Sequence, residues 1–170
     1  MKINFKVCRD AQDLAQFSQY FIRNRADFSG NFNLGEALLY ILRTVPNSQV
    51  VLARGHDGQT IGWTYYRYLT ADGEPHPQGE VAFVDSAIIS EGYRKSGAFV
   101  TGFRFLVNHI VSENENVRTF RFHALADRPY LNRLYGKFAD VIGQADSLLG
   151  VVNVYSSDAE RMSAFFNRLR

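Results

Sequence analysis

The turn between residues 89 and 98 carries the strongest chemical signal in the sequence, because Arg94 and Lys95 are followed there by Ser96 and Gly97. An almost continuously apolar segment precedes the turn and a segment with helical periodicity follows it, which predicts a tight connection from a buried strand to a helix. Unpaired backbone N–H groups and the helix dipole favour an anion at such a helix N-terminus, and small residues allow a phosphate to approach closely. The pattern therefore predicts a pyrophosphate site, and the alternative is an ordinary strand-to-helix turn with solvated charges.

The elements before this turn are predicted from periodicity and turn signals. Asp10 is a candidate helix cap, Pro46 ends a helix, and Asp57-Gly58 is a strong hairpin signal. Residues 71–79 hold two prolines and two glycines, which indicates a loop. The expected elements are a strand at 2–8, helices at 10–24 and 34–43, hairpin strands at 49–54 and 60–69, and a buried strand at 80–89.

The elements after the turn continue this alternation of strands and helices. They are a helix that begins near Ala98, a strand at 117–125, a short helix at 130–138, strands near 139–145 and 148–155, and a final helix from Ser157. Ser157 and Glu160 are the expected capping box of that last helix. Together the segments predict an α/β fold with a mixed central sheet, flanking helices and an extra C-terminal helix, in a single domain over residues 1–170.

Composition limits the classes of function. A net charge of +2 is too small to indicate nucleic-acid binding by itself, and four scattered histidines with one cysteine, Cys8, offer no metal-ligand spacing. No apolar run approaches a membrane span, and Met1 leads directly into a strand pattern without a signal core, so we expect a cytoplasmic protein. The apolar stripe of the last helix must be buried against this domain or a second copy, so a homodimer is one option.

The order of elements and the turn sequence resemble the GNAT (acetyltransferase) superfamily. Its central strand runs into the pattern V-x-P-x-Y-R-G-x-G-x-G/A, and Tyr93, Arg94 and Gly97 match it, with Ile89 as a conservative replacement. Glu91, Lys95 and Phe99 stand where the family has proline, glycine and a small residue. The resemblance implies that acetyl-CoA is the cosubstrate and that its pyrophosphate binds at Ile89, Tyr93, Arg94, Lys95, Ser96, Gly97, Ala98 and Phe99.

The second half of the chain supports the resemblance. Residues 134–138, Leu-Tyr-Gly-Lys-Phe, are similar to the family's L-Y-x-K-G-F segment, and the resemblance implies that Tyr135 protonates the leaving thiolate. The family often has an asparagine seven residues earlier, at a further CoA contact, and this chain has Arg128 there. Asn132 does not occupy that position.

In such a family an acceptor amine attacks the thioester directly, and a carboxylate or histidine serves as general base. Asp85 is the first candidate because it interrupts an apolar strand, where an unpaired carboxylate is costly. Glu80, at the start of that strand, is the second candidate, and His123 on the next strand is a weaker one. The alternative for Asp85 is a buried ion pair with an arginine such as Arg121.

The resemblance therefore predicts an N-acyltransferase acting on a small-molecule amine or a protein amino group. Two alternatives stay open: an enzyme that modifies nucleic-acid bases on the same fold, and a non-catalytic protein that binds acyl-CoA. The run from Trp63 to Tyr68 bears on the first alternative, because aromatic side chains beside Arg67 could stack a planar base. Cross-strand packing explains the same residues more simply.

Overall fold

The computed structural model describes residues 3–28, 32–94, 97–147 and 149–168 of the chain. The chain divides into two compact units: unit 1 comprises Met1–Tyr66 and Ala87–Gly102, and unit 2 comprises Arg67–Ser86 and Phe103–Arg170. The expectation of a single domain over residues 1–170 stays a prediction.

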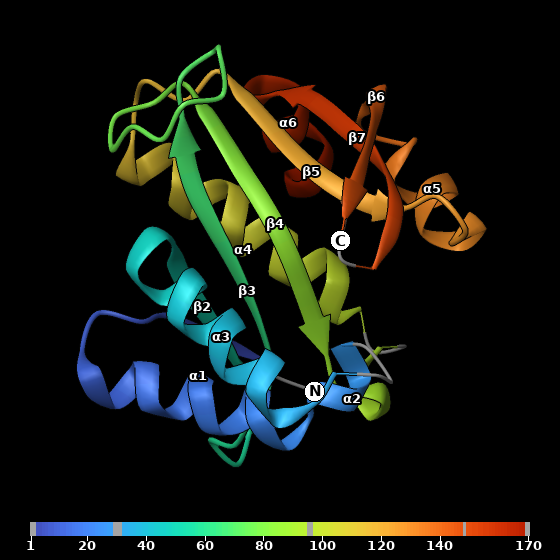
Figure 1. The fold of residues 1–170 in the computed structure, drawn as a ribbon. Coiled ribbons are helices and arrows are strands. Elements are labelled where there is room, and N and C mark those ends of the chain that lie inside the picture. Colours follow the sequence, from blue (N-terminus) through green and yellow to red (C-terminus); the bar gives the residue numbers. More distant parts are fainter. Residues whose placement is uncertain (1–2, 29–31, 95–96, 148, 169–170) are drawn as a thin grey trace. The chain divides into compact units, whose positions relative to one another are not determined.

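Seven strands of the described residues form one mixed sheet in the order β1-β2-β3-β4-β5-β7-β6 (Figure 1). The strands are β1 Asn4–Val7, β2 Gln49–Arg54, β3 Thr60–Leu69, β4 Val81–Ile89, β5 Thr119–Leu125, β6 Asp140–Ser147 and β7 Gly150–Asp158. β4 and β5 are parallel, whereas β1–β2, β2–β3, β5–β7 and β6–β7 are antiparallel. The mixed α/β fold class predicted from the sequence is confirmed.

In the described part of the chain, six α-helices accompany the sheet: α1 Ala11–Arg23, α2 Arg25–Phe28, α3 Leu34–Thr44, α4 Ala98–Glu113, α5 Pro129–Tyr135 and α6 Ala159–Arg168. α4 begins at Ala98 as predicted. The four-residue α2 was not expected, because so short a segment gives no periodicity to recognise.

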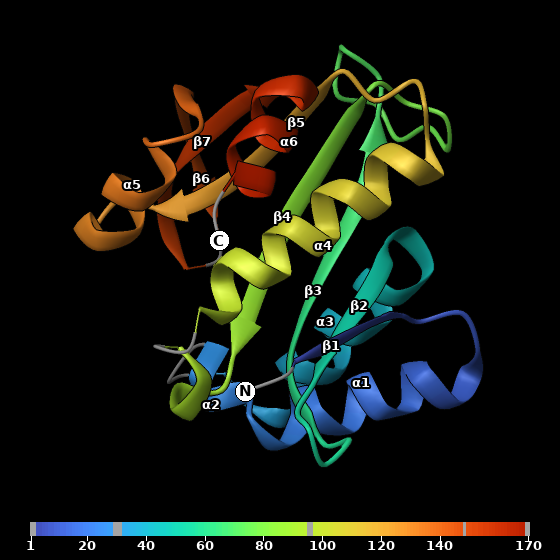
Figure 2. The ribbon, with the colours of Figure 1, turned by 180° about the vertical axis from the view of Figure 1, so that it is seen from behind.

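The core of unit 1 lies between α1, α3 and the strands β2 and β3. Figure 1 shows α1 and α3 in front of these strands, and Figure 2 shows them behind. Phe17 and Phe21 are fully buried and pack edge-on against Trp63, and the rings of Trp63 and Tyr65 are stacked 5.9 Å apart. Trp63 and Tyr65 are thus core residues, as the simpler packing explanation expected.

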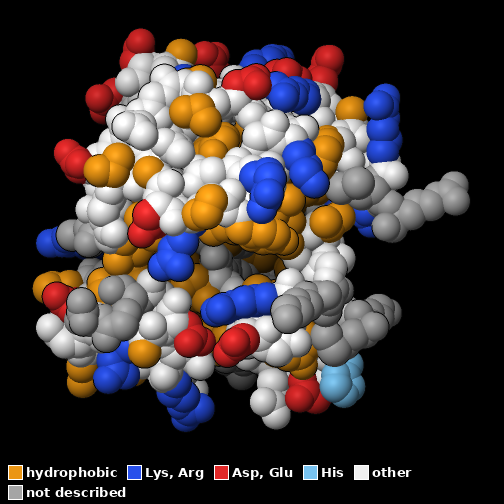
Figure 3. Space-filling model, turned by 90° about the vertical axis from the view of Figure 1, so that its right-hand side faces the viewer, with side chains coloured by type: hydrophobic (Ala, Val, Ile, Leu, Met, Phe, Trp, Pro, Cys, Tyr) orange, Lys and Arg blue, Asp and Glu red, His pale blue; other side chains and the backbone are white. Residues whose placement is uncertain are grey.

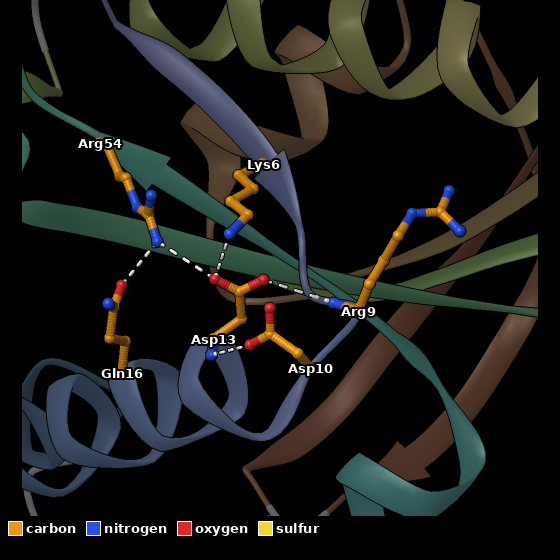
Figure 4. Close-up of polar contacts among 6 residues, drawn as sticks. All are labelled: Lys6, Arg9, Asp10, Asp13, Gln16 and Arg54. Carbon is orange, nitrogen blue, oxygen red and sulfur yellow. Dashed lines mark hydrogen bonds and ion pairs between the residues drawn. The ribbon is translucent and has the colours of Figure 1, made fainter.

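A buried carboxylate fixes the start of α1 (Figure 4). Asp10 caps the helix by accepting a hydrogen bond of 2.8 Å from the backbone N–H of Asp13. The side chain of Asp13, only 3% exposed, accepts from Lys6 Nζ at 2.6 Å and from Arg54 Nη2 at 3.3 Å. Cys8 is buried nearby, and its burial raises the pKa of its thiol to about 12.

The core of unit 2 lies between α4, α6 and the strands β5 and β7. Figure 2 shows α6 in front of β5, and Figure 1 shows it behind. Phe166 stacks on Phe103 at 5.3 Å and meets Phe138 at 4.9 Å, and Met162 is fully buried. The apolar stripe of α6 is therefore buried by its own chain at these positions, and Leu169 lies outside the described residues.

The capping box expected at Ser157 and Glu160 is wrong. Ser157 belongs to β7, and its buried hydroxyl donates to Phe138 O at 2.7 Å. Asp158 takes the capping position instead, accepting from the backbone N–H of Arg161 at 2.7 Å. The long-range bond to Phe138 draws Ser157 into the sheet, so α6 begins two residues later than predicted.

Candidate functional site

The turn after β4 belongs to unit 1 and is anchored at its first residue. Ser90 N–H donates to Ile61 O at 2.7 Å, and the hydroxyl of Tyr20 lies 2.6 Å from Ser90 Oγ. The same tyrosine hydroxyl donates to Ile61 O at 3.0 Å. Tyr20 therefore ties α1 to the point where β3 and the turn meet, a role that its helical position in the sequence did not reveal.

The middle of the turn is a single helical turn at Glu91–Tyr93, and Arg94 follows it. Arg94 is exposed, and its Nε donates to Ile89 O at 3.0 Å, which holds the guanidinium back over the turn. Tyr93 is half-buried, and a Cβ added at Gly55 would come within 3.1 Å of its hydroxyl. Of the predicted phosphate contacts, Lys95 and Ser96 lie outside the described residues.

The end of the turn is a glycine in a left-handed conformation. Gly97 has φ 75, which residues with a Cβ rarely adopt, and its carbonyl accepts from Thr101 N at 3.0 Å. Ala98 is buried, and Phe99 is half-buried on the first turn of α4. The first amides of a helix have no partner within it, so those of residues 98–100 are the donors that this end offers.

In unit 2, Asp85 and His123 stand where two parallel strands separate. The pairing of β4 with β5 runs from Val81 opposite Thr119 to Val84 opposite Phe122. Asp85 and His123 are the next residues on the two strands, and both are half-buried. The structure thus brings together the first and the weaker of the predicted base candidates.

The electrostatics of His123 follow from this position. Burial lowers the pKa of its imidazole, the positive charge of Arg67 lowers it further, and the charge of Asp85 opposes both. The imidazole is therefore neutral at neutral pH and can accept a proton. The predicted alternative partner of Asp85, Arg121, has a buried Nε without a hydrogen-bond partner in the described part of the chain.

Tyr135 closes α5 and lies among four aromatic rings. The ring centroids of Phe122 and Tyr155 are 4.9 and 5.5 Å from that of Tyr135, and both contacts are edge-on. Phe138 and Phe103 lie at 5.8 and 6.3 Å. This burial, together with Tyr155, raises the pKa of the Tyr135 phenol to about 12, so the group keeps its proton throughout the neutral range.

The two remaining predicted residues of unit 2 are both exposed. Glu80 precedes β4, and its backbone carbonyl accepts from Arg118 N at 2.8 Å. It lies five residues before Asp85, or roughly 16 Å along an extended strand. Arg128 precedes α5 and makes an exposed ion pair of 3.6 Å with Asp127.

Asn132 forms a hydrogen-bond network that the sequence did not predict. Its Oδ1 accepts hydrogen bonds from Tyr155 Oη at 2.7 Å and from Asn153 Nδ2 at 2.8 Å. Its Nδ2 donates to Leu125 O and Arg128 O, each at 2.8 Å. These partners come from three separate segments, so no local sequence pattern could have predicted them.

Comparison with solved structures identifies the fold. An acetyltransferase of the GNAT family from Streptococcus pneumoniae superposes with a TM-score of 0.64 and 11% identity, covering 92% of this chain and 99% of that chain. NAA60 of Arabidopsis thaliana, solved with a bisubstrate analogue, gives a TM-score of 0.68 and 16% identity over 92% and 99% of the two chains. A spermidine N-acetyltransferase chimera from Vibrio cholerae and hSSAT gives 0.68 and 12% over 95% and 98%.

The chain has the GNAT acetyltransferase fold. No protein-family model matches the sequence, and no curated protein matches it by sequence. The likeness is therefore one of architecture, and it confirms the fold that the sequence resemblance implied.

Two further features concern other classes of ligand. Across residues 3–28, 32–94, 97–147 and 149–168, no group of three or more His, Cys, Asp or Glu side chains could hold a metal ion, and no helix is long and apolar enough to cross a membrane. Figure 3 shows one face of the molecule, on which basic side chains are interspersed with acidic and apolar ones.

Proposed function

We propose that this protein is a CoA-dependent N-acyltransferase that moves an acetyl group from acetyl-CoA to an amine. The observation that carries the proposal is the turn from Ile89 to Ala98 on a GNAT fold. Gly97 has the left-handed φ at the position where the family pattern has glycine, directly before the N-terminus of α4.

The residues of this turn fit a pyrophosphate. A Cβ built on Gly97 would meet no described heavy atom within 4 Å, so the approach to the helix end is open at that residue. The backbone amides of Ala98 and Phe99 would donate to the phosphate oxygens, and Arg94 would add formal charge. Bound acetyl-CoA would supply an acyl group activated as a thioester.

Tyr135 would act on the leaving sulfur by hydrogen bonding. A phenol of pKa about 12 holds its proton some 3.5 pKa units more tightly than a thiol of pKa roughly 8.5, so full transfer to a thiolate is uphill by about 5 kcal/mol. Donation of a hydrogen bond stabilises the developing negative charge without that cost. We therefore assign Tyr135 the role of donor that keeps its proton.

Asp85 is the preferred general base, and neutral His123 lies beside it. A base of this kind takes the proton of the attacking amine, either directly or through one water molecule. Glu80 is the poorer candidate because it is exposed and lies five residues earlier on the strand.

The experiment measures acetyl-CoA binding by thermal shift and CoA release against a panel of amines. Binding should raise the melting temperature, and turnover should be lowered by Tyr135→Phe and by Asp85→Asn. The absence of both binding and turnover at millimolar acetyl-CoA would refute the proposal. Binding without turnover, unchanged in both variants, would establish the non-catalytic alternative, and salt-sensitive retention on DNA would favour the nucleic-acid alternative.

A further inference from the structure

One face of the sheet in unit 2 gathers Arg67, Phe83, Arg121 and His123. The β4–β5 register places Phe83 opposite Arg121, and His123 shares the face of Arg121 because side chains alternate along a strand. The Cζ atom of Arg67 lies 5.1 Å from the centre of the Phe83 ring. The His123 ring meets the same ring edge-on, with the centroids 4.8 Å apart. Two arginines and a histidine therefore share the neighbourhood of one aromatic ring.

This face of β5 lies on the side of the strand opposite the unit 2 core. Buried and half-buried residues alternate along the strand, and the buried ones include Phe120 and Phe122. The ring of Phe122 contacts Phe138 at 5.7 Å on the side of the unit 2 core. Arg121 and His123 belong to the half-buried set and lie on the other side of the strand.

Both arginines carry an unmet hydrogen-bond donor. The Nε atoms of Arg67 and Arg121 are buried and have no partner among the residues that the structure describes. Arg54 has a similar Nε, but its guanidinium is held by Asp13 at 3.3 Å and by Gln16 at 2.6 Å. A buried N–H without a partner destabilises the folded protein. Two guanidinium groups with unmet donors on one face favour a ligand that accepts hydrogen bonds.

The charge on this face also favours an anionic ligand. His123 is neutral at neutral pH, because burial and Arg67 lower the pKa of its imidazole against the opposing charge of Asp85. The positive charge therefore comes from Arg67 on β3 and Arg121 on β5, while β4 contributes the carboxylate of Asp85. A guanidinium presents its donors as a planar fork, which matches the oxygens of a carboxylate or a phosphate.

We propose that Arg67 and Arg121 bind an anionic group of the acceptor, so that the substrate is an amine that also carries a carboxylate or a phosphate. This inference rests on the proposed acetyl transfer and names the substrate class of that reaction. The ring of Phe83 forms the apolar floor of the site, and Asp85 lies two residues further along the same face of β4. A polycation such as spermidine is disfavoured by the two guanidinium groups.

The test compares acceptors that differ only in the anionic group. Phenylalanine is paired with phenylalaninamide, and phosphoethanolamine with ethanolamine, so the two pairs distinguish a carboxylate from a phosphate. We expect kcat/KM to favour the anionic member of at least one pair by tenfold or more. Arg67→Gln and Arg121→Gln should each lower kcat/KM for that member by about 10–100-fold, the worth of a charged hydrogen bond. The KM for acetyl-CoA should stay within about twofold.

Two variants keep the test independent of a folding defect. Arg67→Lys retains the charge but not the fork and should fall between the wild type and Arg67→Gln. Arg168→Gln changes an exposed arginine of α6 and should behave as the wild type. Melting temperatures of all variants are compared first. The inference would be overturned if kcat/KM were equal for both members of each pair. It would also be overturned if the Gln variants lowered kcat/KM equally for the anionic and the neutral member.

A binding measurement separates this inference from the proposed function. Calorimetric titration of the anionic acceptor without acetyl-CoA should show binding that Arg67→Gln and Arg121→Gln weaken and Arg168→Gln does not. Such binding without any acetyl transfer would leave the anion site standing and refute the proposed function. If spermidine or neutral amines are acetylated as efficiently as the anionic amines, the proposed acetyl transfer stands and the anion site is refuted.

Discussion

The hydroxyl of Tyr155 donates a hydrogen bond of 2.7 Å to Oδ1 of Asn132, which joins β7 to the helix that carries Tyr135. The amide of Asn132 also binds the backbone carbonyl of Leu125 at the end of β5. One side chain thus satisfies polar groups from α5, β5 and β7. Because Tyr135 lies three residues further along α5, Asn132 acts on the proposed chemistry as a positioning residue.

Replacing Asn132 by leucine should lower the free energy of unfolding by about 2–4 kcal/mol, because a side chain of similar size leaves several polar partners unpaired. Tyr155→Phe removes one hydroxyl donor, which is shared between Oδ1 of Asn132 at 2.7 Å and its backbone carbonyl at 3.3 Å, and should cost only about 1 kcal/mol. Asn108→Leu, in an exposed amide pair with Asn167, serves as the control and should cost less than either. Urea denaturation measures all three. An Asn132→Leu variant no less stable than Tyr155→Phe would contradict the network.

The left-handed Gly97 predicts a second effect, on cosubstrate binding. Gly97→Ala forces a Cβ into φ 75 and should destabilise the turn by about 1–2 kcal/mol. The strain should also weaken acetyl-CoA binding by tenfold or more in calorimetric titration. Gly92→Ala is the matched control, because Gly92 lies in the same turn, is not among the positive-φ glycines, and has open space for a Cβ. Equal affinities in the two variants would refute the role of the turn.

The features that the sequence predicted correctly depend on local signals. The Asp57-Gly58 hairpin and the start of α4 at Ala98 depend on residues within a few positions, and Gly58 has the positive φ that such a turn requires. The capping box at Ser157 failed because the partner of its hydroxyl, Phe138 O, lies 19 residues away. The face shared by Arg67 and Arg121 depends on strand order and register, which composition and periodicity do not specify.

The buried carboxylate of Asp13 makes acid stability testable. Its pKa is lowered, first by the hydrogen bond from Lys6, so its contribution is present above the ordinary value of 3.8 and is lost as the pH falls through the lower folded value. Asp13→Asn should cost about 2 kcal/mol at pH 7, a value below that of a fully buried pair because the Lys6 side chain is 46% exposed.

The comparison variant for Asp13 is Asp10→Asn, which keeps a good helix cap and should change stability little. Urea denaturation between pH 2.5 and pH 7 measures both variants against the wild type. The difference between Asp13→Asn and the wild type should shrink as the pH falls below about 4. A difference that is constant over this range would show that the carboxylate charge does not carry the effect.

Tyr135 gives the sharpest prediction for catalysis. Tyr135→Phe keeps the ring contacts with Phe122 and Tyr155 and removes only the hydroxyl, so stability should change by no more than about 1 kcal/mol. If the phenol stabilises the developing thiolate, kcat should fall by about 10–100-fold while the KM for acetyl-CoA stays within about twofold. Single-turnover and steady-state rates of CoA release measure the two parameters.

The pH profile of the same variant tests which form of Tyr135 acts. The phenol pKa of about 12 keeps the wild-type group protonated, so Tyr135 should produce no alkaline decline in kcat below about pH 10. The acid limb, in contrast, should persist in Tyr135→Phe, because it reports the base that takes the proton of the amine. If that base is His123, whose pKa is lowered by burial, kcat/KM should rise with pH along a limb whose midpoint lies below the ordinary imidazole value of 6.5. An alkaline decline between pH 8 and pH 10 that disappears in Tyr135→Phe would show instead that the phenol titrates during turnover and transfers its proton.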